Sequence, residues 1–498
     1  MNEIKEKYMK SRNKITVYLL SLCGLLSLQG CEGILDEPVK SQFTESTLLA
    51  TKSGIESVLV DAYAKDGGIR DVIKRGEMTT DIMWQTGGGE NGTAVPLINF
   101  RWDSSSTLEA FNWMNHWQEI RNTNIVLANT PGASGFTNEA ERTSLLAEAR
   151  FIRIWAYYQL WDQFGPVPIR KSLDDPLELP RATDEEFKEF IESELKAIIP
   201  DLYETGKQPA YGRAHKGAAQ TLLCIWYLNT HQWQNCADMA KEIMSSNKFA
   251  LCPDYNKMFA LENEKNEEFI WVKTYLANSG QTNNILATNL PWDFYKGLDG
   301  GIEGVINEKW SNFASQYRFY DEFYYSFAPE DQRKGRILTK YEDSKGKVID
   351  LLVDYKDATR GMKYPPDPNA SANNHGNDFP FFRYAEILLA RAEALNELNG
   401  PNQESVDLLN QIRNRAGLGN VTLSDFHSKE AFVDQLLNER KWEFWNEGKR
   451  RRDLIRTNRF IKCAHDRGIT NAQDFHVWFP IPQSAIDASS LLKQNDGY

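Results

Sequence analysis

Several aromatic side chains of this 498-residue chain occur in polar or glycine-rich stretches that offer little apolar surface for burial. A sugar ring has an apolar face of C–H groups and a rim of hydroxyls, so a carbohydrate site combines flat aromatic platforms with planar polar groups. We therefore predict ligand contacts for Trp84 in "TTDIMWQTGGGENG", Trp102 in "NFRWDSSS", and Trp292 with Tyr295 in "NLPWDFYKG".

Three glutamates at four-residue spacing resemble a set of catalytic carboxylates. Glu439, Glu443 and Glu447 fall on one face of a predicted helix, and glycosidases use two carboxylates around the bond that they cleave. Basic residues adjoin them, including the run "KRRR" at 449–452. We interpret the glutamates as a structural ion-pair network and the basic run as a salt-bridged helix end, and we expect no catalytic residues.

Metal ligands and nucleophiles show no recognisable spacing. The seven histidines are dispersed without an HExxH motif, and the cysteines form no CxxC or Cys/His pattern. We therefore expect no metal centre and no cofactor. A structural Ca²⁺ among the central Asp and Asn residues stays open as an alternative, although no ligand spacing supports it.

The elements that must position these residues are mostly helical. Apolar residues over 145–160 recur at spacings of three and four, which predicts one continuous helical stripe. Gly165–Pro166 should end this helix, and Thr183 should cap the next. Two further pairs are "GRAHKGAAQTLLCIWYLNT" with "WQNCADMAKEIMSSNKF", and "FFRYAEILLARAEALNELNG" with "ESVDLLNQIRNRAGLG", in which Gly400–Pro401 should end one helix and start the next. These hairpins resemble degenerate tetratricopeptide units.

Between residues 250 and 380 the helical periodicity is lost. Gly, Asn, Asp, Pro and aromatic residues dominate there, as in "KYPPDPNASANNHGNDFP". We expect loops with short strands and helices. Loops of this kind commonly carry the functional residues of a helical scaffold.

The N-terminus has the layout of a secretory signal. A Lys- and Arg-rich start precedes an apolar run of about 16 residues, which is short for a membrane span. Leu28-Gln29-Gly30-Cys31 resembles a bacterial lipobox. We therefore predict a signal peptide over 1–30, lipidation of Cys31 and a tether over 31–44, with acyl chains such as palmitate making the only membrane contact.

The charge balance argues against nucleic acid as a partner. The formal net charge is -12, and Lys and Arg are scattered along the chain. No broad positive field is therefore available to attract a polyanionic backbone.

Seven segments together resemble the SusD/RagB family of outer-membrane lipoproteins of Bacteroidetes. In family order they are Cys31 with "ILDEP", "AEARFIRIWAYYQLWDQFGPVPI", "GRAHKGAAQTLLCIWYL", "FFRYAEILLARAEALNELNG", "LNQIRNRAGL", "LLNERKWEFWNEGKRRRDLIR" and "WFPIPQSAIDASSLLKQNDGY". The resemblance implies a mostly α, SusD-like fold, in which four tetratricopeptide-like hairpins accompany an irregular ligand-binding part. We expect an N-terminal part over 45–250 and a C-terminal part over 251–498, loop-rich over 251–380.

The resemblance also implies a function. Such a protein is not an enzyme but a lipid-anchored glycan-binding protein of the outer membrane, facing the cell exterior, that serves as a lid on a SusC-like TonB-dependent transporter. Family contacts commonly come from loops that correspond here to 81–106 and 281–325, and the polar candidates in them are Asp81, Gln85, Asn91, Arg101 and Asp293. Three alternatives stay open: a peptide or other nutrient as ligand, a helical glycoside hydrolase or lyase, and an assembly protein without a small ligand.

Overall fold

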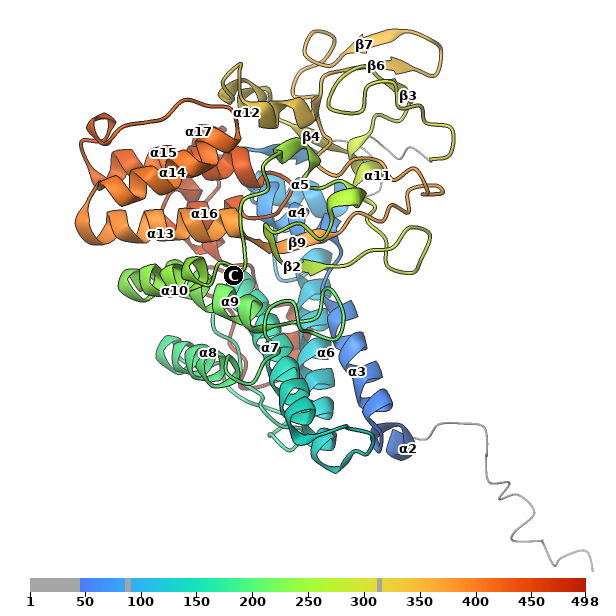
Figure 1. Cartoon of the computed structure of the whole chain (residues 1–498), viewed down its shortest axis with the longest axis vertical. Coiled ribbons are helices and arrows are strands. Elements are labelled where there is room, and N and C mark those ends of the chain that lie inside the picture. The colour runs from blue at the N-terminus through green and yellow to red at the C-terminus, as the bar shows by residue number, and fades with distance from the viewer. Residues whose placement is uncertain (1–44, 86–90, 311–315) are drawn as a thin grey trace, which may run out of the picture. The chain divides into compact units, whose positions relative to one another are not determined.

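The computed structural model describes residues 45–85, 91–310 and 316–498 (Figure 1). Cys31, the predicted signal peptide and the predicted tether lie outside these ranges. The chain divides into two compact units, Met1–Leu48 and Leu49–Tyr498. Within the described ranges, no helix combines the length and the apolarity needed to cross a membrane. Everything below concerns the second unit.

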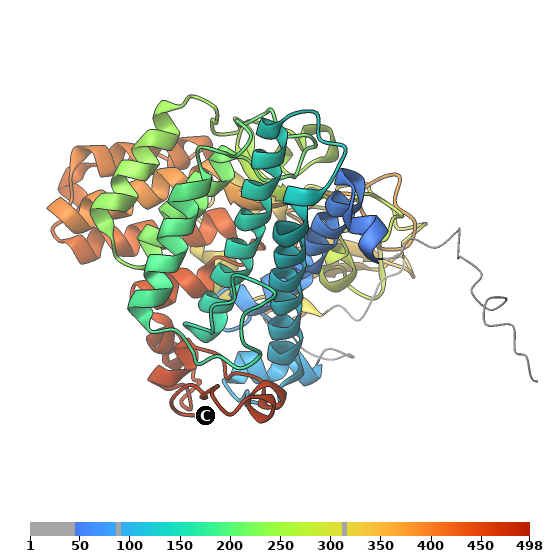
Figure 2. The same cartoon turned by 90° about the horizontal axis from the view of Figure 1, so that it is seen from below.

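Long helices form the framework of this unit, as predicted from the periodicity, and each contacts the next long helix along the chain. Figures 1 and 2 show α6 to α10 side by side, and successive helices of this series contact one another. The long helices are α3 (Lys52–Lys65), α6 (Thr107–Asn129), α7 (Glu139–Phe164), α8 (Asp184–Ile198), α9 (Lys216–Asn229), α10 (Trp233–Ser245), α13 (Tyr384–Asn399), α14 (Gln403–Arg415) and α15 (Lys429–Phe444).

The shorter helices of this unit are α4 (Ile69–Glu77), α5 (Asn91–Asn99), α11 (Ile285–Asn289), α12 (Asp321–Ser326), α16 (Arg450–Arg456), α17 (Phe460–Asp466) and α18 (Gln483–Ala488). Helix α2 (Glu45–Leu49) ends at the first residue of this unit.

Local signals explain where several helices begin and end. Gly165 follows the last residue of α7 at φ 74°, a left-handed conformation that favours glycine. Thr183 and Glu186 form a reciprocal capping box at the start of α8. Both predicted boundaries are confirmed. Gly400 likewise ends α13, but Asn402 caps α14 by accepting the Ser405 N–H, so the prediction that Pro401 starts this helix is wrong.

The range 250–380 contains only short elements, as predicted; the helices and strands described there span at most six residues. All strand pairs are antiparallel: β2 (Phe269–Lys273) with β9 (Phe379–Arg383), β1 (Met83–Gln85) with β4 (Tyr317–Phe319), β5 (Ile337–Leu338) with β8 (Arg360–Gly361), and β3 (Phe294–Gly297) with β6 (Lys340–Asp343) and β7 (Val348–Asp350). Strands β3, β6 and β7 lie in the upper part of Figure 1, at the opposite end from α8.

A set of buried ion pairs, which we call the buried network, joins α15 to the loop-rich part. Its members are Glu268, Arg333, Lys363, Arg383, Arg415, Glu439, Glu443 and Glu447. Nitrogen–oxygen distances are 2.7 Å for Arg333 with Glu439 and 2.5 Å for Arg415 with Glu443.

The interpretation of the three glutamates as a structural ion-pair network is confirmed. Their principal partners come from distant elements rather than from the basic residues beside them. The run at 449–452 instead forms ion pairs with carboxylates of other elements, among them Asp81 and Asp162, so its interpretation as a salt-bridged helix end is also confirmed.

Candidate functional site

A recess on the loop-rich part is the candidate binding site, and we call it the aromatic recess. Its volume is about 80 Å³. Two of the residues predicted from the sequence, Trp292 and Asp293, lie in its lining. The full lining is Pro291, Trp292, Asp293, Arg318, Tyr341, Leu351, Tyr355, Ala358 and Arg360.

Two aromatic side chains of this lining are open to solvent. Trp292 is 70% exposed and Tyr355 is 52% exposed. Trp292 lies in a turn between α11 and β3, in which the Phe294 N–H donates to the Pro291 carbonyl at 3.1 Å. Because the Phe294 side chain is buried, this turn anchors the exposed indole. Two exposed aromatic faces in one recess make it a candidate interaction site.

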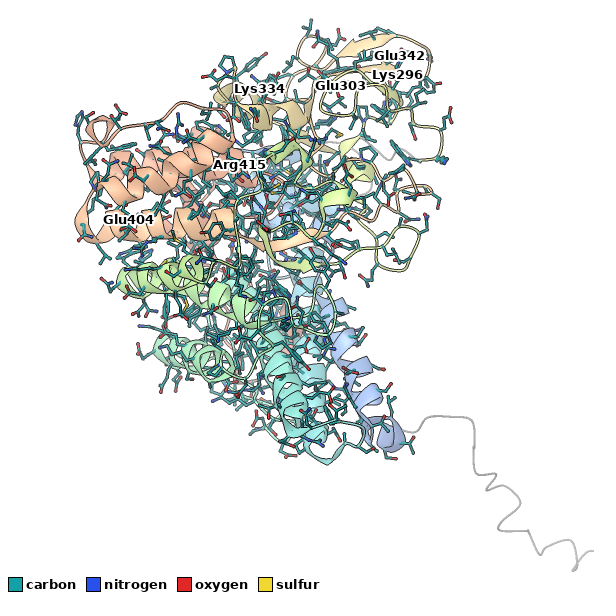
Figure 3. The ribbon with its side chains drawn as sticks, viewed as in Figure 1. Lys296, Glu303, Lys334, Glu342, Glu404 and Arg415 are labelled. Carbon is teal, nitrogen blue, oxygen red and sulfur yellow. The ribbon has the colours of Figure 1, made fainter. Side chains whose placement is uncertain are left out.

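A hydrogen bond fixes the polar side of the recess. The Tyr341 hydroxyl donates to Asp293 Oδ1 at 2.8 Å. Burial and this carboxylate together raise the pKa of Tyr341, so the phenol stays neutral and serves as a donor. Tyr341 belongs to β6, whose next residue Glu342 is the ladder partner of Lys296 on β3 (Figure 3).

Arg318 enters the recess from β4, where its ladder partner is Trp84 on β1. The guanidinium carbon lies 5.6 Å from the centroid of the Trp84 ring, a cation–π contact. Trp84 Nε1 donates to the Asp357 carbonyl at 2.7 Å. The half-buried Trp84 therefore supports Arg318 and is not itself part of the lining.

Arg360 on β8 brings a second guanidinium group to the recess. It is buried, and its Nη1 donates to the Tyr317 carbonyl at 3.1 Å. Burial and the neighbouring Arg318 lower the pKa of Arg360 to about 9. Burial also lowers the pKa of Arg318.

The other predicted ligand residues lie outside the recess lining. Tyr295 is 37% exposed on β3, Arg101 is exposed after α5, and Gln85 is buried at the end of β1. Asn91 begins α5, but its side chain lies outside what the structure describes, as do residues 86–90 and 311–315 of the predicted contact loops.

The C-terminal segment of the chain covers Trp102, which the sequence predicts to contact a ligand. The side chain is 4% exposed, and its Nε1 donates to the Tyr498 hydroxyl at 2.7 Å. The ring also packs edge-on against His476 and Phe479. Its polar sequence neighbours gave no sign of this distant cover.

Asp81, another predicted ligand residue, forms ion pairs within the chain. Its two carboxylate oxygens accept from Arg450 at 2.8 and 2.9 Å, and Lys441 lies 3.6 Å away. Burial alone would raise the pKa of Asp81, but the Arg450 charge outweighs burial and holds this pKa well below its usual range. The pair ties the turn that follows α4 to α16.

Sequence reasoning missed the four other aromatic or charged lining residues, Arg318, Tyr341, Tyr355 and Arg360. Tyr355 lies in "LVDYKDATRG", which has the same polar texture as the stretches around the predicted aromatic residues. That criterion would have found Tyr355. The two arginines reach the recess only through the pairing of distant strands, which no local pattern reveals.

Two larger hollows lack exposed aromatic faces. A cavity of about 220 Å³ between α3, α7 and β2 is walled by Trp155, Trp271 and Phe381, whose rings are buried. A groove of about 590 Å³ runs along α8 and is lined mainly by polar and small residues. In the described part of the chain, no three His, Cys, Asp or Glu side chains gather as metal ligands would. The expectations about cofactors and Ca²⁺ stay predictions.

Two family models match the chain. The model described as "SusD family" covers residues 232–498, and the model described as "Starch-binding associating with outer membrane" covers residues 35–228. SusD-like protein P25 of Formosa agariphila is 24% identical over 98% of this chain and 99% of its own length. Starch-binding protein SusD of Bacteroides thetaiotaomicron is 27% identical over 87% and 86%.

Solved structures share the fold. A laminarin binding SusD-like protein aligns with a TM-score of 0.76 at 22% identity, covering 90% of this chain and 100% of its own. Surface glycan-binding protein A from Bacteroides uniformis aligns with a TM-score of 0.75 at 24% identity, covering 89% and 99%. The mostly helical SusD-like fold expected from the sequence is thus confirmed. Since the SusD family model spans more than half of its residues, the chain belongs to the SusD family.

Proposed function

We propose that this protein is a cell-surface glycan-binding lipoprotein that captures an oligosaccharide at the aromatic recess and delivers it to a SusC-like TonB-dependent transporter. The observation that carries the proposal is the exposure of Trp292 and Tyr355 beside polar side chains in one recess. A sugar ring can stack on either aromatic face while Asp293 and Arg318 bond with its hydroxyls.

The placement in the cell follows from the N-terminus and from the family. A lipidated Cys31 would hold the protein in the outer membrane, facing the exterior, after removal of residues 1–30. The description of the matching N-terminal family model, which names association with the outer membrane, supports this placement. The names of two relatives, a starch-binding protein and a laminarin binding protein, support a glycan as ligand.

Cleavage of the glycan is not part of the proposed function. The evenly spaced glutamates, the strongest carboxylate set in the sequence, are engaged in the buried network. Burial alone would raise the pKa of Glu443, but Arg415, Arg383 and Arg333 outweigh burial and hold it well below its usual range. A general acid needs the opposite shift.

Isothermal titration of the chain from residue 32 onward with a panel of oligosaccharides and peptides tests ligand binding. We expect at least one glycan to bind, and binding to be lost in the double variant Trp292→Ala/Tyr355→Ala. Tyr325→Ala is the matched control, because Tyr325 is 63% exposed on α12, outside the recess lining. A panel without any bound glycan, or a double variant that binds normally, would contradict the proposal. New reducing ends after incubation with a bound glycan would show an enzyme instead.

Fractionation of native cells tests the partner and the anchor. The protein should co-purify with a TonB-dependent barrel from detergent-solubilised outer membranes, and protease added to intact cells should degrade it. Cys31→Ala should abolish the incorporation of labelled palmitate. A protein that stays in the periplasm, or that purifies without any barrel, would contradict this part.

A further inference from the structure

The cavity of about 220 Å³ between α3, α7 and β2, which we call the Trp155 cavity, combines aromatic walls with buried carboxyl groups. Its walls are Trp155, Trp271 and Phe381, whose ring centroids lie 4.8 to 5.1 Å apart. The lining reaches the surface at Val60, which is 64% exposed, and at the exposed Gln281. Since a cavity of about 150 Å³ can hold benzene, this one has room for a ring with a short substituent.

Two carboxyl groups of the lining are buried, and each has one oxygen without a hydrogen-bond partner. Asp66, directly after α3, is 4% exposed, and Glu119 on α6 is fully buried. Asp66 Oδ2 accepts from Trp155 Nε1 at 3.2 Å, and Glu119 Oε2 lies 3.0 Å from His116 Nδ1. Among the described residues, no donor reaches Asp66 Oδ1 or Glu119 Oε1. Because a buried polar atom without a partner is destabilising, a ligand that donates to these oxygens would stabilise the site.

One of these two carboxyl groups carries a negative charge. Burial and the Asp66 charge raise the pKa of Glu119 well above its usual range, although the Lys273 charge opposes them. Burial lowers the pKa of His116 to about 3, so this imidazole is neutral. At neutral pH, Glu119 therefore holds its proton and Asp66 carries the charge.

The two cationic side chains of the lining are engaged by other groups. Arg213 forms ion pairs with Glu148 at 2.6 Å and with Glu56 at 3.0 Å. The Lys273 ammonium group donates to the two main-chain carbonyl groups that follow α3. Neither cation donates to the two free carboxyl oxygens, in the part of the chain that the structure describes.

An ammonium group suits these oxygens better than a hydroxyl or a carboxylate does. It brings three N–H donors and a positive charge, and a charged donor bonds a carboxylate about twice as strongly as a neutral one. The Asp66 charge would repel a carboxylate, and a hydroxyl would bring no counter-charge. The aromatic walls favour an apolar body on the same ligand.

We propose that the Trp155 cavity is a second ligand site, which binds a small organic amine with its ammonium group on Asp66 and its apolar body against Trp155 and Trp271. This inference goes beyond the proposed glycan-binding function and does not depend on it.

Ligands that share a ring and differ in their head group test the proposal. The probes are phenethylamine, phenethyl alcohol and phenylpropanoate, titrated at neutral pH into the chain from residue 32 onward. We expect the amine to bind roughly tenfold more tightly than the alcohol and the carboxylate to bind more weakly than either. Equal binding of amine and alcohol, or no binding of the amine, would overturn the inference and leave the glycan-binding function intact. Glucose that binds in the cavity in place of the amine would also overturn it.

Two matched variants test the role of Asp66. Asp66→Asn removes the charge but keeps an oxygen for Trp155 Nε1, and it should weaken amine binding roughly tenfold. Asp61→Asn removes the same charge from an exposed position on α3 outside the lining and should leave amine binding unchanged. Circular dichroism checks that both variants are folded. An amine affinity that Asp66→Asn does not change would overturn the assignment.

A crystal structure of the wild-type chain with phenethylamine locates the ligand without any variant. We expect the ammonium nitrogen within hydrogen-bond distance of Asp66 Oδ1 and the ring beside Trp155. Water alone in the cavity, with the amine bound elsewhere, would overturn the inference. The double variant Trp292→Ala/Tyr355→Ala should lose glycan binding but keep amine binding. Loss of both ligands would indicate one shared site and would contradict a second one.

Discussion

Arginine side chains occupy two contrasting environments in this protein, the buried network and the aromatic recess. In the network, Arg383 contacts carboxylates of Glu443 and Glu447 at 2.9 and 2.8 Å, and these charges raise its pKa although burial alone would lower it. In the recess, burial and a neighbouring arginine lower the pKa of Arg360. In the network the neighbouring carboxylates outweigh burial, whereas in the recess burial outweighs the nearby carboxylate of Asp293.

The largest expected effect comes from breaking the buried network at Arg383. Arg383→Ala would leave the buried carboxylates of Glu443 and Glu447 without a principal partner, which should lower the free energy of unfolding by about 3–5 kcal/mol. Urea denaturation followed by circular dichroism measures this loss. The control is Arg459→Ala, which breaks the exposed pair with Asp434 and should change stability by less than about 0.5 kcal/mol. Equal losses in the two variants would contradict a structural role of the network.

The pH dependence of stability tests a further buried carboxyl group, that of Glu77, which adjoins the network. Its Oε1 accepts the N–H groups of Glu447 and Gly448 at 2.9 Å each, yet burial raises its pKa to about 7. Between about pH 4.3, the unfolded value, and about pH 7, the native state therefore keeps a proton that the unfolded state releases. Stability from this group falls as pH rises through that window, by on the order of 3 kcal/mol in total.

Glu77→Gln should remove this dependence, because the amide does not titrate. Urea denaturation of both proteins at about pH 5 and about pH 7 makes the comparison. Glu443 does not affect this comparison. Because its pKa is lowered, its stabilising ion pairs are lost only as the pH falls below this window. An identical fall in stability in the wild type and the variant would show that Glu77 does not hold the proton.

In the recess, Trp292→Ala should affect binding and leave folding unchanged. The indole is mostly exposed, so its removal should change the free energy of unfolding by less than about 0.5 kcal/mol. Loss of the stacking platform should weaken glycan affinity roughly tenfold, or by about 1.4 kcal/mol. Trp102→Ala should have the opposite effect, because removal of this buried ring should lower the free energy of unfolding. Glycan titration and urea denaturation of both variants test this assignment. A Trp292→Ala protein with a lower free energy of unfolding than Trp102→Ala would contradict it.

The smallest effect is expected from Tyr341→Phe, which removes only the hydroxyl that donates to Asp293. One hydrogen bond of this kind stabilises a fold by about 1 kcal/mol. Thermal denaturation should show this difference, whereas Tyr325→Phe on exposed α12 should show none. A Tyr341→Phe protein as stable as the wild type would indicate that the Asp293 contact does not stabilise the recess.

The helical part of the fold could be predicted from the sequence because its signals are local. The stripe over 145–160, the stop at Gly165 and the cap at Thr183 each depend on residues within a few positions of one another. The partners of Glu443 could not be predicted, since Arg383 and Arg415 come from other elements of the fold.

The candidate site was only partly predictable for the same reason. Trp292 was identified because its own neighbours are too polar to bury it, and Asp293 because it lies in a loop from which the family resemblance implies ligand contacts. Arg318 joins them through a ladder with Trp84, more than two hundred positions away, and such a register has no local signature. The cover over Trp102 has no local signature either, because Tyr498 comes from the far end of the chain.

A crystal structure of the chain with the tightest-binding glycan of the oligosaccharide panel shows directly where the ligand lies. We expect a sugar ring stacked on Trp292, with its hydroxyls within hydrogen-bond distance of Asp293 or Arg318. A glycan bound beside Trp155 and Trp271, or in the groove along α8, with the aromatic recess empty, would contradict it.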